Sequence, residues 1–313
     1  MDIIQALPSC IAAGFSHQLF LDSEGKVYRK GENLQNQFSL QGILTKVVPT
    51  LVGGLPVIKS VHAAESNSLF IDCGGNVYGW GDNNNHELGL EVFSVKTPTQ
   101  IKGIPPMQTI VMVQHHTLFL DFEGNVWRCG KHMGTYKKSP EIIPGLPVII
   151  SITNNYTKYF LLQDNGLLWT YSPFDEPSQY GRGKQLPRMI SIFNSVGVDA
   201  NGNVWSLFYY CKVNLIKFKD IFIHIDGSTW QAKEPNQGTQ FVADIETKFT
   251  RLPLPTIHAL AVGSGSLLML DGEGAVWEID SSPLTKPKRI KNLPIITRAI
   301  GNSIRQLKSA RNL

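Results

Sequence analysis

Several short stretches contain residue types that could bind metal ions. His115 and His116 are adjacent imidazoles, and DNNNHE (82–87) has alternating oxygen donors that resemble a calcium-binding loop. No third ligand accompanies the two histidines, and the acidic run lacks the Gly at its sixth position and the Glu at its twelfth. Asx turns explain the acidic run better. We therefore expect no metal and no other cofactor.

Sequence motifs of covalent catalysis are also missing. GSGS (263–266) has the glycines of a phosphate-binding loop without its Lys. No Ser, His and Asp stand in an order typical of nucleophilic catalysis. Cys10, Cys73, Cys129 and Cys211 lie far apart without CxxC spacing, which predicts buried free thiols of a reducing compartment. We therefore expect a cytoplasmic protein that is not an enzyme.

Long polar stretches could instead bind a partner. They cover residues 31–42, 81–97, 172–184 and 233–248. If each follows the same strand of a repeated unit, all four emerge on one rim, and loops on a rigid scaffold commonly hold binding residues. For any single loop, a hydrophilic connection without a partner is the alternative. The predicted partner-binding residues, chosen as anchors, are Asp82, His86, Glu87, Phe93, Phe174, Asp175, Glu176, Tyr180 and Phe241.

A repeated frame must position these loops. Seven times along the chain, a Gly is followed three residues later by an aromatic residue. An acidic residue and a Gly favour a tight hairpin turn, while the apolar run before it and the Val-aromatic pair after it favour strands. The seven pairs are Gly25 and Tyr28, Gly75 and Tyr78, Gly124 and Trp127, Gly166 and Trp169, Gly202 and Trp205, Gly227 and Trp230, and Gly274 and Trp277.

A Leu-Pro or Ile-Pro dipeptide marks the start of each unit, which leaves room for about four short strands. The frame glycines are on average 41.5 residues apart, a spacing typical of propeller blades. The sequence thus predicts an all-β, seven-bladed β-propeller with about four antiparallel strands per blade. A final half-unit (293–307) resembles the opening of the chain, so we expect paired terminal strands to close the ring. The predicted domains are the propeller (1–307) and a basic C-terminal tail (308–313).

Charge is unevenly distributed along the chain. Residues 283–313 contain eight basic and no acidic residues, whereas the whole chain has a formal net charge of +4. Such a segment can bind an anionic membrane, an acidic protein or nucleic acid. The alternative is a solvated last blade with a helical end.

One stretch resembles a known family. VYGWGDNNNHELGL (77–90) is similar to the regulator-of-chromosome-condensation repeat family, whose blades combine Trp-Gly, an Asn and a Gly-Gln-Leu-Gly turn. His86 and Glu87 replace the usual Gly and Gln, and His116 corresponds to a structural histidine of the family. The matching residues are Trp80, Gly81, Asn83, Leu88 and Gly89.

The resemblance implies a seven-bladed propeller that presents loops to protein partners. The family's founding activity is guanine nucleotide exchange on the small GTPase Ran, and its relatives include effectors that intracellular bacteria deliver into host cells. One hypothesis is therefore a monomeric exchange factor for a small GTPase, located in the cytoplasm, or in the host cytosol for a delivered effector, rather than in the nucleus. The alternative is a non-catalytic interaction scaffold. A lectin-like or chromatin-bound propeller is a third, weaker hypothesis.

Overall fold

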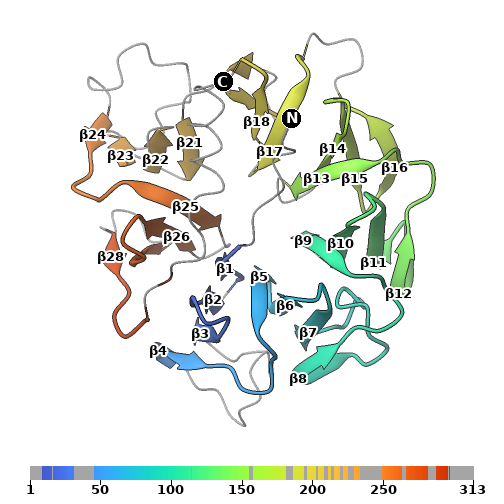
Figure 1. The fold of residues 1–313 in the computed structure, drawn as a ribbon, viewed down its shortest axis with the longest axis horizontal. Coiled ribbons are helices and arrows are strands. Elements are labelled where there is room, and N and C mark those ends of the chain that lie inside the picture. The colour runs from blue at the N-terminus through green and yellow to red at the C-terminus, as the bar shows by residue number, and fades with distance from the viewer. Residues whose placement is uncertain are drawn as a thin grey trace.

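The computed structural model describes most of the chain. The described residues are 9–15, 17–31, 46–113, 115–154, 158–180, 186–193, 196–201, 204–207, 211–212, 215–218, 221–224, 229–232, 249–262, 266–280, 287–294 and 296. They contain strands and turns, and Figure 1 shows the strands grouped into sheets around a common centre. Within these ranges, no helical segment has the length and apolarity to span a lipid bilayer.

The described strands form seven antiparallel sheets of four consecutive strands each. The first sheet contains β1 (Ile11–Ala13), β2 (His17–Leu21), β3 (Val27–Gly31) and β4 (Lys46–Leu51). The second contains β5 (Ile58–Ala64), β6 (Asn67–Asp72), β7 (Val77–Asp82) and β8 (Ser94–Gln100). The third contains β9 (Met107–Val113), β10 (His116–Asp121), β11 (Val126–His132) and β12 (Thr135–Ile142). The fourth contains β13 (Ile149–Asn154), β14 (Tyr159–Gln163), β15 (Leu168–Ser172) and β16 (Asp175–Gln179).

The remaining sheets repeat this order. The fifth contains β17 (Met189–Phe193), β18 (Val196–Asp199), β19 (Val204–Ser206) and β20 (Cys211–Lys212). The sixth contains β21 (Leu215–Phe218), β22 (Ile221–His224), β23 (Thr229–Ala232) and β24 (Phe249–Arg251). The last contains β25 (Ile257–Val262), β26 (Ser266–Asp271), β27 (Val276–Asp280) and β28 (Lys288–Arg289). Four-stranded antiparallel sheets arranged as blades are the architecture of a β-propeller.

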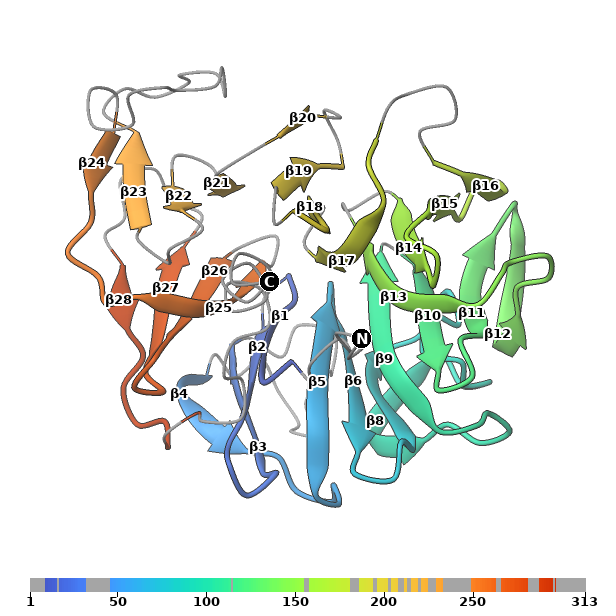
Figure 2. The same ribbon diagram turned by 45° about the horizontal axis from the view of Figure 1, so that its top comes forward.

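Neighbouring sheets stand side by side with their first strands toward the centre. β5 and β9 are adjacent in both views (Figures 1 and 2), and β9 contacts β13. The outer strands face solvent, and β8, β12 and β16 each contain a Pro opposite an irregular register. A Pro and a bulge both disfavour pairing of an edge strand with another chain.

The predicted hairpin frame is built around one acidic side chain. In the third sheet, Asp121 Oδ1 accepts hydrogen bonds from the backbone N–H groups of Glu123 (3.1 Å) and Asn125 (2.8 Å). Its Oδ2 accepts the indole N–H of Trp127 at 2.9 Å. Asp271 and Trp277 repeat the arrangement at 2.8 Å. The aromatic residue of these frames is therefore half-buried and bonded to its own hairpin, whereas Trp80 of the second sheet, which lies outside the frame, is fully buried.

The frame Gly joins each sheet to the next. Gly124 has a φ of 86°, which L side chains rarely adopt, and a Cβ there would lie 2.6 Å from Val148 Cγ1. Its carbonyl accepts the N–H of Ile149, the first residue of β13, at 3.0 Å. The corresponding bonds of the other described frames join Gly25 to Ile58, Gly75 to Met107, Gly166 to Met189, and Gly274 to Ile296. The frames at Gly202 and Gly227 lie outside the described residues, as do the side chains of Trp205 and Trp230.

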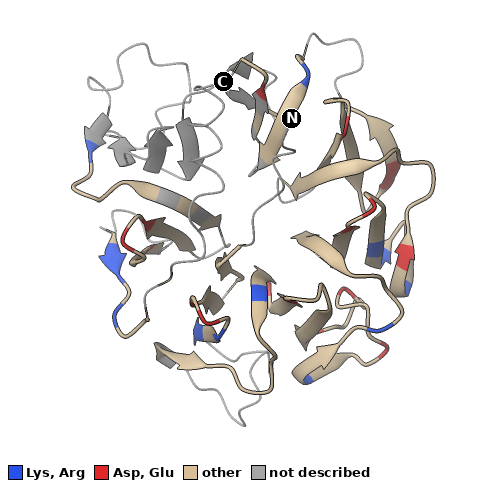
Figure 3. Cartoon of the chain, viewed as in Figure 1, with Lys and Arg blue, Asp and Glu red and all other residues tan. Residues whose placement is uncertain are grey.

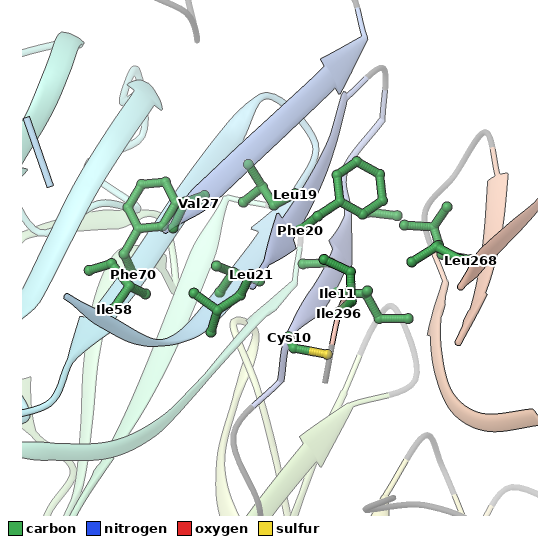
Figure 4. Close-up of a cluster of buried hydrophobic side chains, with 14 of the residues drawn as sticks. Cys10, Ile11, Leu19, Phe20, Leu21, Val27, Ile58, Phe70, Leu268 and Ile296 are labelled. Carbon is green, nitrogen blue, oxygen red and sulfur yellow. The ribbon is translucent and has the colours of Figure 1, made fainter. Parts of the chain in front are cut away.

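The first and last sheets share a core. Figure 4 shows Phe20 of β2 and Leu268 of β26 facing each other, with Ile11 and Ile296 in the same cluster. Gln18 donates to Ser266 Oγ at 3.1 Å and to Glu278, which also pairs with Lys30. Side-chain packing thus joins the first sheet to the last sheet. The predicted pairing of terminal strands involves the half-unit 293–307, of which residues 295 and 297–307 lie outside the described residues.

The expectation of buried cysteines needs one correction. Cys10 and Cys129 are buried free thiols, but Cys73 is exposed. It follows Asp72 in the hairpin turn of the second sheet, where side chains point to solvent. The side chain of Cys211 lies outside the described residues.

Candidate functional site: a rim of loops on the second to fourth sheets

The third strand of each sheet leads into its fourth strand at one edge, which we call the rim. The connections at this edge are the loop 83–93 and the two turns at 133–134 and 173–174. The turns between first and second strands lie at the same edge, because the N–H of Lys131 donates to the His115 carbonyl at 2.8 Å. Loops from three consecutive sheets therefore meet on one face. The predicted loop 233–248 lies outside the described residues, as does the predicted loop 31–42 from residue 32 onward.

The loop 83–93 is held rigid by Asn83. This side chain is fully buried; its Nδ2 donates to the Leu90 carbonyl at 2.7 Å, and its Oδ1 accepts the N–H of Leu88 at 2.8 Å. A side-chain amide that bonds backbone groups on both sides of a loop holds the loop together without strand-to-strand hydrogen bonds. The loop therefore folds as a compact turn around the Asn83 amide.

Glu87 anchors the same loop to the third sheet. Its carboxylate accepts the amide of Asn67 at 3.1 Å and the N–H of Asn85 at 2.8 Å. Its backbone carbonyl accepts the hydroxyl of Thr117 at 2.6 Å and the thiol of Cys129 at 3.2 Å. Because both the side chain and the carbonyl are bonded, the loop is fixed relative to two sheets.

Large apolar side chains are exposed along this rim. Phe93 and Tyr136 both pack on the buried ring of His86, with ring centroids 5.3 Å and 6.1 Å away. The Met133 N–H donates to the Pro173 carbonyl at 2.8 Å, which places the turn of the third sheet against that of the fourth. Exposed apolar groups that gather on one face indicate a binding surface. This rim patch comprises Val92 (56% exposed), Phe93 (63%), Met133 (56%), Tyr136 (48%) and Phe174 (75%).

Backbone strain is concentrated at the same place. Among the described residues, five non-glycine residues have positive φ, and four of them lie at this rim. Such residues cost free energy and are enriched at functional sites. They are Glu65 (47°), His86 (59°), His115 (61°) and Met133 (45°).

Acidic side chains border the patch. Asp175 and Glu176 are exposed next to Phe174, and Glu91 is exposed next to Val92. Lys131 is an exposed cation close to Met133, so the rim carries charges of both signs. Figure 3 likewise shows acidic and basic residues interspersed over the described sheets. The rim can therefore offer apolar contact area and carboxylates to a partner.

A buried polar network lies behind the rim, between the third and fourth sheets. The Arg128 guanidinium donates to Tyr171 Oη at 3.0 Å and to His132 Nε2 at 2.9 Å, and it pairs with Glu141 at 3.0 Å. Because Arg has no acceptor, His132 Nε2 must be unprotonated, so its Nδ1–H donates to Tyr171 Oη at 3.0 Å. Burial and then the Arg128 charge lower the pKa of His132.

His116 continues this network inward. Its Nδ1 lies 3.1 Å from Tyr159 Oη, and its Nε2 lies 3.4 Å from Tyr171 Oη. Burial lowers the pKa of His116 to about 3, and burial raises the pKa of Tyr171 to about 12. The structure thus makes His116 a neutral, bonded core residue. Among the described residues, no group of three potential ligands could hold a metal ion.

The predicted partner-binding residues divide into four groups. Phe93, Phe174, Asp175 and Glu176 lie exposed at the rim, and Asp82 is half-buried beside them. His86 and Glu87 are buried; His86 bonds within the loop and Glu87 also bonds to Asn67, so they shape the rim and offer no free surface. The structure does not bring Tyr180 to the rim: it follows β16 at the opposite end from Phe174, and its hydroxyl donates to the Leu207 carbonyl. Phe241 lies outside the described residues.

Two features of the rim escaped the sequence analysis. The predicted loop 172–184 contains β16, because an edge strand that faces solvent can be as polar as a loop. Met133 and Tyr136 were missed because the third sheet has a two-residue turn in place of a long loop. The available signal was Met133-Gly134 between two strands, since a Gly in a two-residue connection favours a hairpin.

Comparisons with known proteins agree with this architecture. The model of the regulator of chromosome condensation (RCC1) repeat matches residues 74–120, which run from the hairpin of the second sheet to β10 and include the loop 83–93. No curated protein sequence matches the chain significantly.

Several solved structures share the fold. Human WBSCR16 is 15% identical with a TM-score of 0.58, covering 93% of this chain and 82% of that protein. Prp20p of Saccharomyces cerevisiae, characterised for its binding to Gsp1p and histones, is 18% identical with a TM-score of 0.51, covering 90% and 76%. The ectodomain of the Arabidopsis thaliana receptor kinase ACR4 is 11% identical with a TM-score of 0.53, covering 92% and 98%. Residues 74–120 therefore match an RCC1 repeat, and the chain shares the fold of these structures, with four-stranded antiparallel blades.

Proposed function

We propose that this protein binds a small GTPase through the rim of its second to fourth sheets and accelerates release of the bound nucleotide. The observation that carries the proposal is the rim patch, whose exposed Phe93, Met133 and Phe174 stand on rigidly anchored loops. The family resemblance supports the choice of partner, and Prp20p, which shares the fold, binds Gsp1p.

The activity requires no covalent chemistry. A partner that binds the nucleotide-free GTPase more tightly than the nucleotide-bound form shifts the equilibrium toward nucleotide release. A rim that is already ordered loses little conformational entropy on binding, so more of its contact energy is available for this discrimination. The loop 83–93 meets this requirement through the buried bonds of Asn83 and Glu87.

The proposal includes the form in which the protein acts. Seven sheets with a shared core between first and last support a closed, monomeric, seven-bladed ring. We place it in the cytosol, either of its own cell or of a host cell. The basic segment 283–313 would add attraction to an anionic membrane or an acidic protein.

The test is release of fluorescent GDP from purified Ran, Rab, Rap and Rho proteins, with this protein at micromolar concentration. We expect faster release from one of them, and slower exchange with Phe93→Ser and Phe174→Ser. Phe122→Ser is the matched control, because Phe122 is similarly exposed (51%) but lies in the hairpin turn after β10, away from the rim.

Two outcomes would contradict the proposal in different ways. Equal affinity for the GDP-bound, GTP-bound and empty forms would exclude exchange, because a ligand without preference shifts no equilibrium. It would favour the second candidate, an interaction scaffold that localises a partner through the same rim patch. Absence of binding to every GTPase tested would remove the GTPase from the proposal altogether.

A further inference from the structure

His132 occupies a position where a proton changes which partners it can have. It is the last residue of β11, directly before the turn that exposes Met133, and its side chain is 5% exposed. In its neutral form Nε2 accepts from Arg128 at 2.9 Å and Nδ1–H donates to Tyr171 at 3.0 Å. Both ring nitrogens are then satisfied, so the neutral imidazole locks the end of β11 to the fourth sheet.

Protonation removes this arrangement. A proton on Nε2 would face the Arg128 guanidinium, so that two donors and two positive charges oppose each other. Glu176 Oε1 of β16 lies 3.6 Å from the same nitrogen and is the carboxylate that can accept it. Glu176 is largely exposed, so it can move toward the imidazolium.

The other titratable and charged groups around His132 do not offer an equivalent partner. Glu141 of β12 is already bonded to Arg128 at 3.0 Å and to Lys137 at 2.9 Å. Tyr159 of β14 bonds to the neutral His116 of β10 at 3.1 Å, and Tyr171 of β15 bonds to Arg128. The neighbouring Arg128 and Lys137 repel a positive charge, which leaves Glu176 as the acceptor.

We propose that His132 is a protonation switch of the rim: neutral, it joins Arg128 and Tyr171, and protonated, it pairs with Glu176 and loosens the turn at Met133 and Gly134. The hydrogen bond from the Met133 N–H to the Pro173 carbonyl (2.8 Å) couples that turn to Phe174. Uptake of one proton from solvent therefore disturbs the rim patch at the contact between the third and fourth sheets. That this weakens partner binding rests on the proposed function; the change in the turn does not.

The direction of the pH response follows from the environment of the His132 imidazole. Burial and Arg128 lower the pKa of His132 in the folded protein below the ordinary value of about 6.5. The locked form therefore persists at neutral pH and is lost as the pH falls through the lowered pKa. Acidification through that lowered pKa is the signal to which the switch responds.

Amide hydrogen exchange at pH 7.5 and 5.5, corrected for intrinsic rates, tests the turn directly. The Met133 amide should lose about tenfold more protection than the Ile149 amide, which donates to Gly124 and serves as the internal reference. His132→Gln should abolish this difference, because Gln presents an uncharged acceptor to Arg128 at both pH values. His115→Gln, which replaces another rim histidine, should retain it. An unchanged response in His132→Gln, or equal changes at Met133 and Ile149, would overturn the proposal.

A second measurement tests the proposal if the His132→Gln variant fails to fold. Glu176→Gln alters an exposed side chain, and NMR titration of the imidazole should show His132 protonating at lower pH than in the wild type. An identical midpoint would show that Glu176 is not the partner of the protonated form. GTPase affinity at both pH values is measured in parallel. Absence of binding at both pH values would retire the proposed function, while the hydrogen-exchange data would still decide the switch.

Discussion

Asp121 shows how a single side chain organises a hairpin of this fold. Two backbone N–H groups of the turn and the indole of Trp127 all donate to its carboxylate. The same bonds recur at Asp271, so the acidic residue of the frame has a structural role in each. In the fourth sheet Gln163 takes this position and still accepts the Trp169 indole at 3.1 Å. The side chain that the frame requires is thus an oxygen acceptor six residues before the aromatic residue.

Asp121→Ala should lower the free energy of unfolding by about 3 kcal/mol, because it leaves several part-buried donors without an acceptor. Urea denaturation followed by circular dichroism measures the change. Asp164→Ala is the control: Asp164 lies in the equivalent turn of the fourth sheet with its side chain exposed, so less than about 0.5 kcal/mol is expected. Similar losses in both variants would show that the network of bonds at Asp121 contributes little.

At the scale of elements, the rim is a set of connections whose conformations are costly by themselves. Met133 and Gly134 form the two-residue turn between β11 and β12 with φ values of 45° and 78°. Asn and Gly favour this turn, whereas Met there is both strained and exposed. An apolar residue at such a position is consistent with selection for contact with a partner over stability.

Met133→Asn should therefore stabilise the fold by about 0.5–1 kcal/mol and at the same time weaken the activity of the rim. Thermal unfolding measures the first effect, and the GDP-release assay measures the second. Phe122→Ser controls for general loss of exposed apolar area. A variant that is more stable and fully active would exclude Met133 from the binding surface.

At the scale of the whole molecule, the first and last sheets contact each other through a shared core. Ile296 follows β28, is fully buried in the first-sheet core, and donates its N–H to Gly274 at 3.1 Å. This bond matches the one that each earlier frame Gly within the described residues makes with the sheet that follows it. Ile296 thus makes the contact that the first strand of an additional sheet would make.

Ile296→Ala should cost about 3 kcal/mol, since it opens a cavity between the first and last sheets. The unfolding midpoint in urea gives the value, with Ile142→Ala as the control because Ile142 is exposed on β12. A loss no larger than that of the control would argue against the shared core as the means of joining the ends.

Acid should destabilise the folded protein through its buried neutral histidines. Burial lowers the pKa of His17 to about 4 and that of His116 to about 3, whereas an unfolded histidine titrates near 6.5. The stabilisation is present above about pH 6.5 and is lost as the pH falls toward the folded pKa values. At 1.36 kcal/mol per pH unit, the loss is on the order of 3 kcal/mol for each histidine by pH 4.

Urea denaturation between pH 7.5 and 4 measures this dependence. His17→Gln should flatten part of the profile, because Gln has no proton to take up in the unfolded chain. A stability that stays constant from pH 7 to 4.5 would contradict the neutral, buried state of both histidines.

The sequence was most informative about features that depend on a few neighbouring residues. A turn needs a Gly with positive φ and an oxygen acceptor next to it, so the hairpins at Gly75 and Gly124 could be predicted from a few residues. Four strands per unit followed from the spacing of these markers, and the exposed Phe93 and Phe174 followed from the loops that contain them. The same local logic misplaced Cys73 in the core, because a single apolar residue in a turn has no pattern to reveal its exposure.

Only the tertiary structure decided which of these residues act together. Tyr136 joins Phe93 because both rings pack on His86, although the two positions are far apart in the chain. Glu87 and Tyr180 were equally plausible as contact residues in the sequence. Packing makes Glu87 an anchor of the loop 83–93 and places Tyr180 at the opposite end of β16 from the rim. The network of Arg128, His132 and Tyr171 crosses two sheets, and its donor pattern exists only once those sheets meet. Local chemistry determines turns and strands from sequence alone, whereas a shared surface depends on how separate units pack.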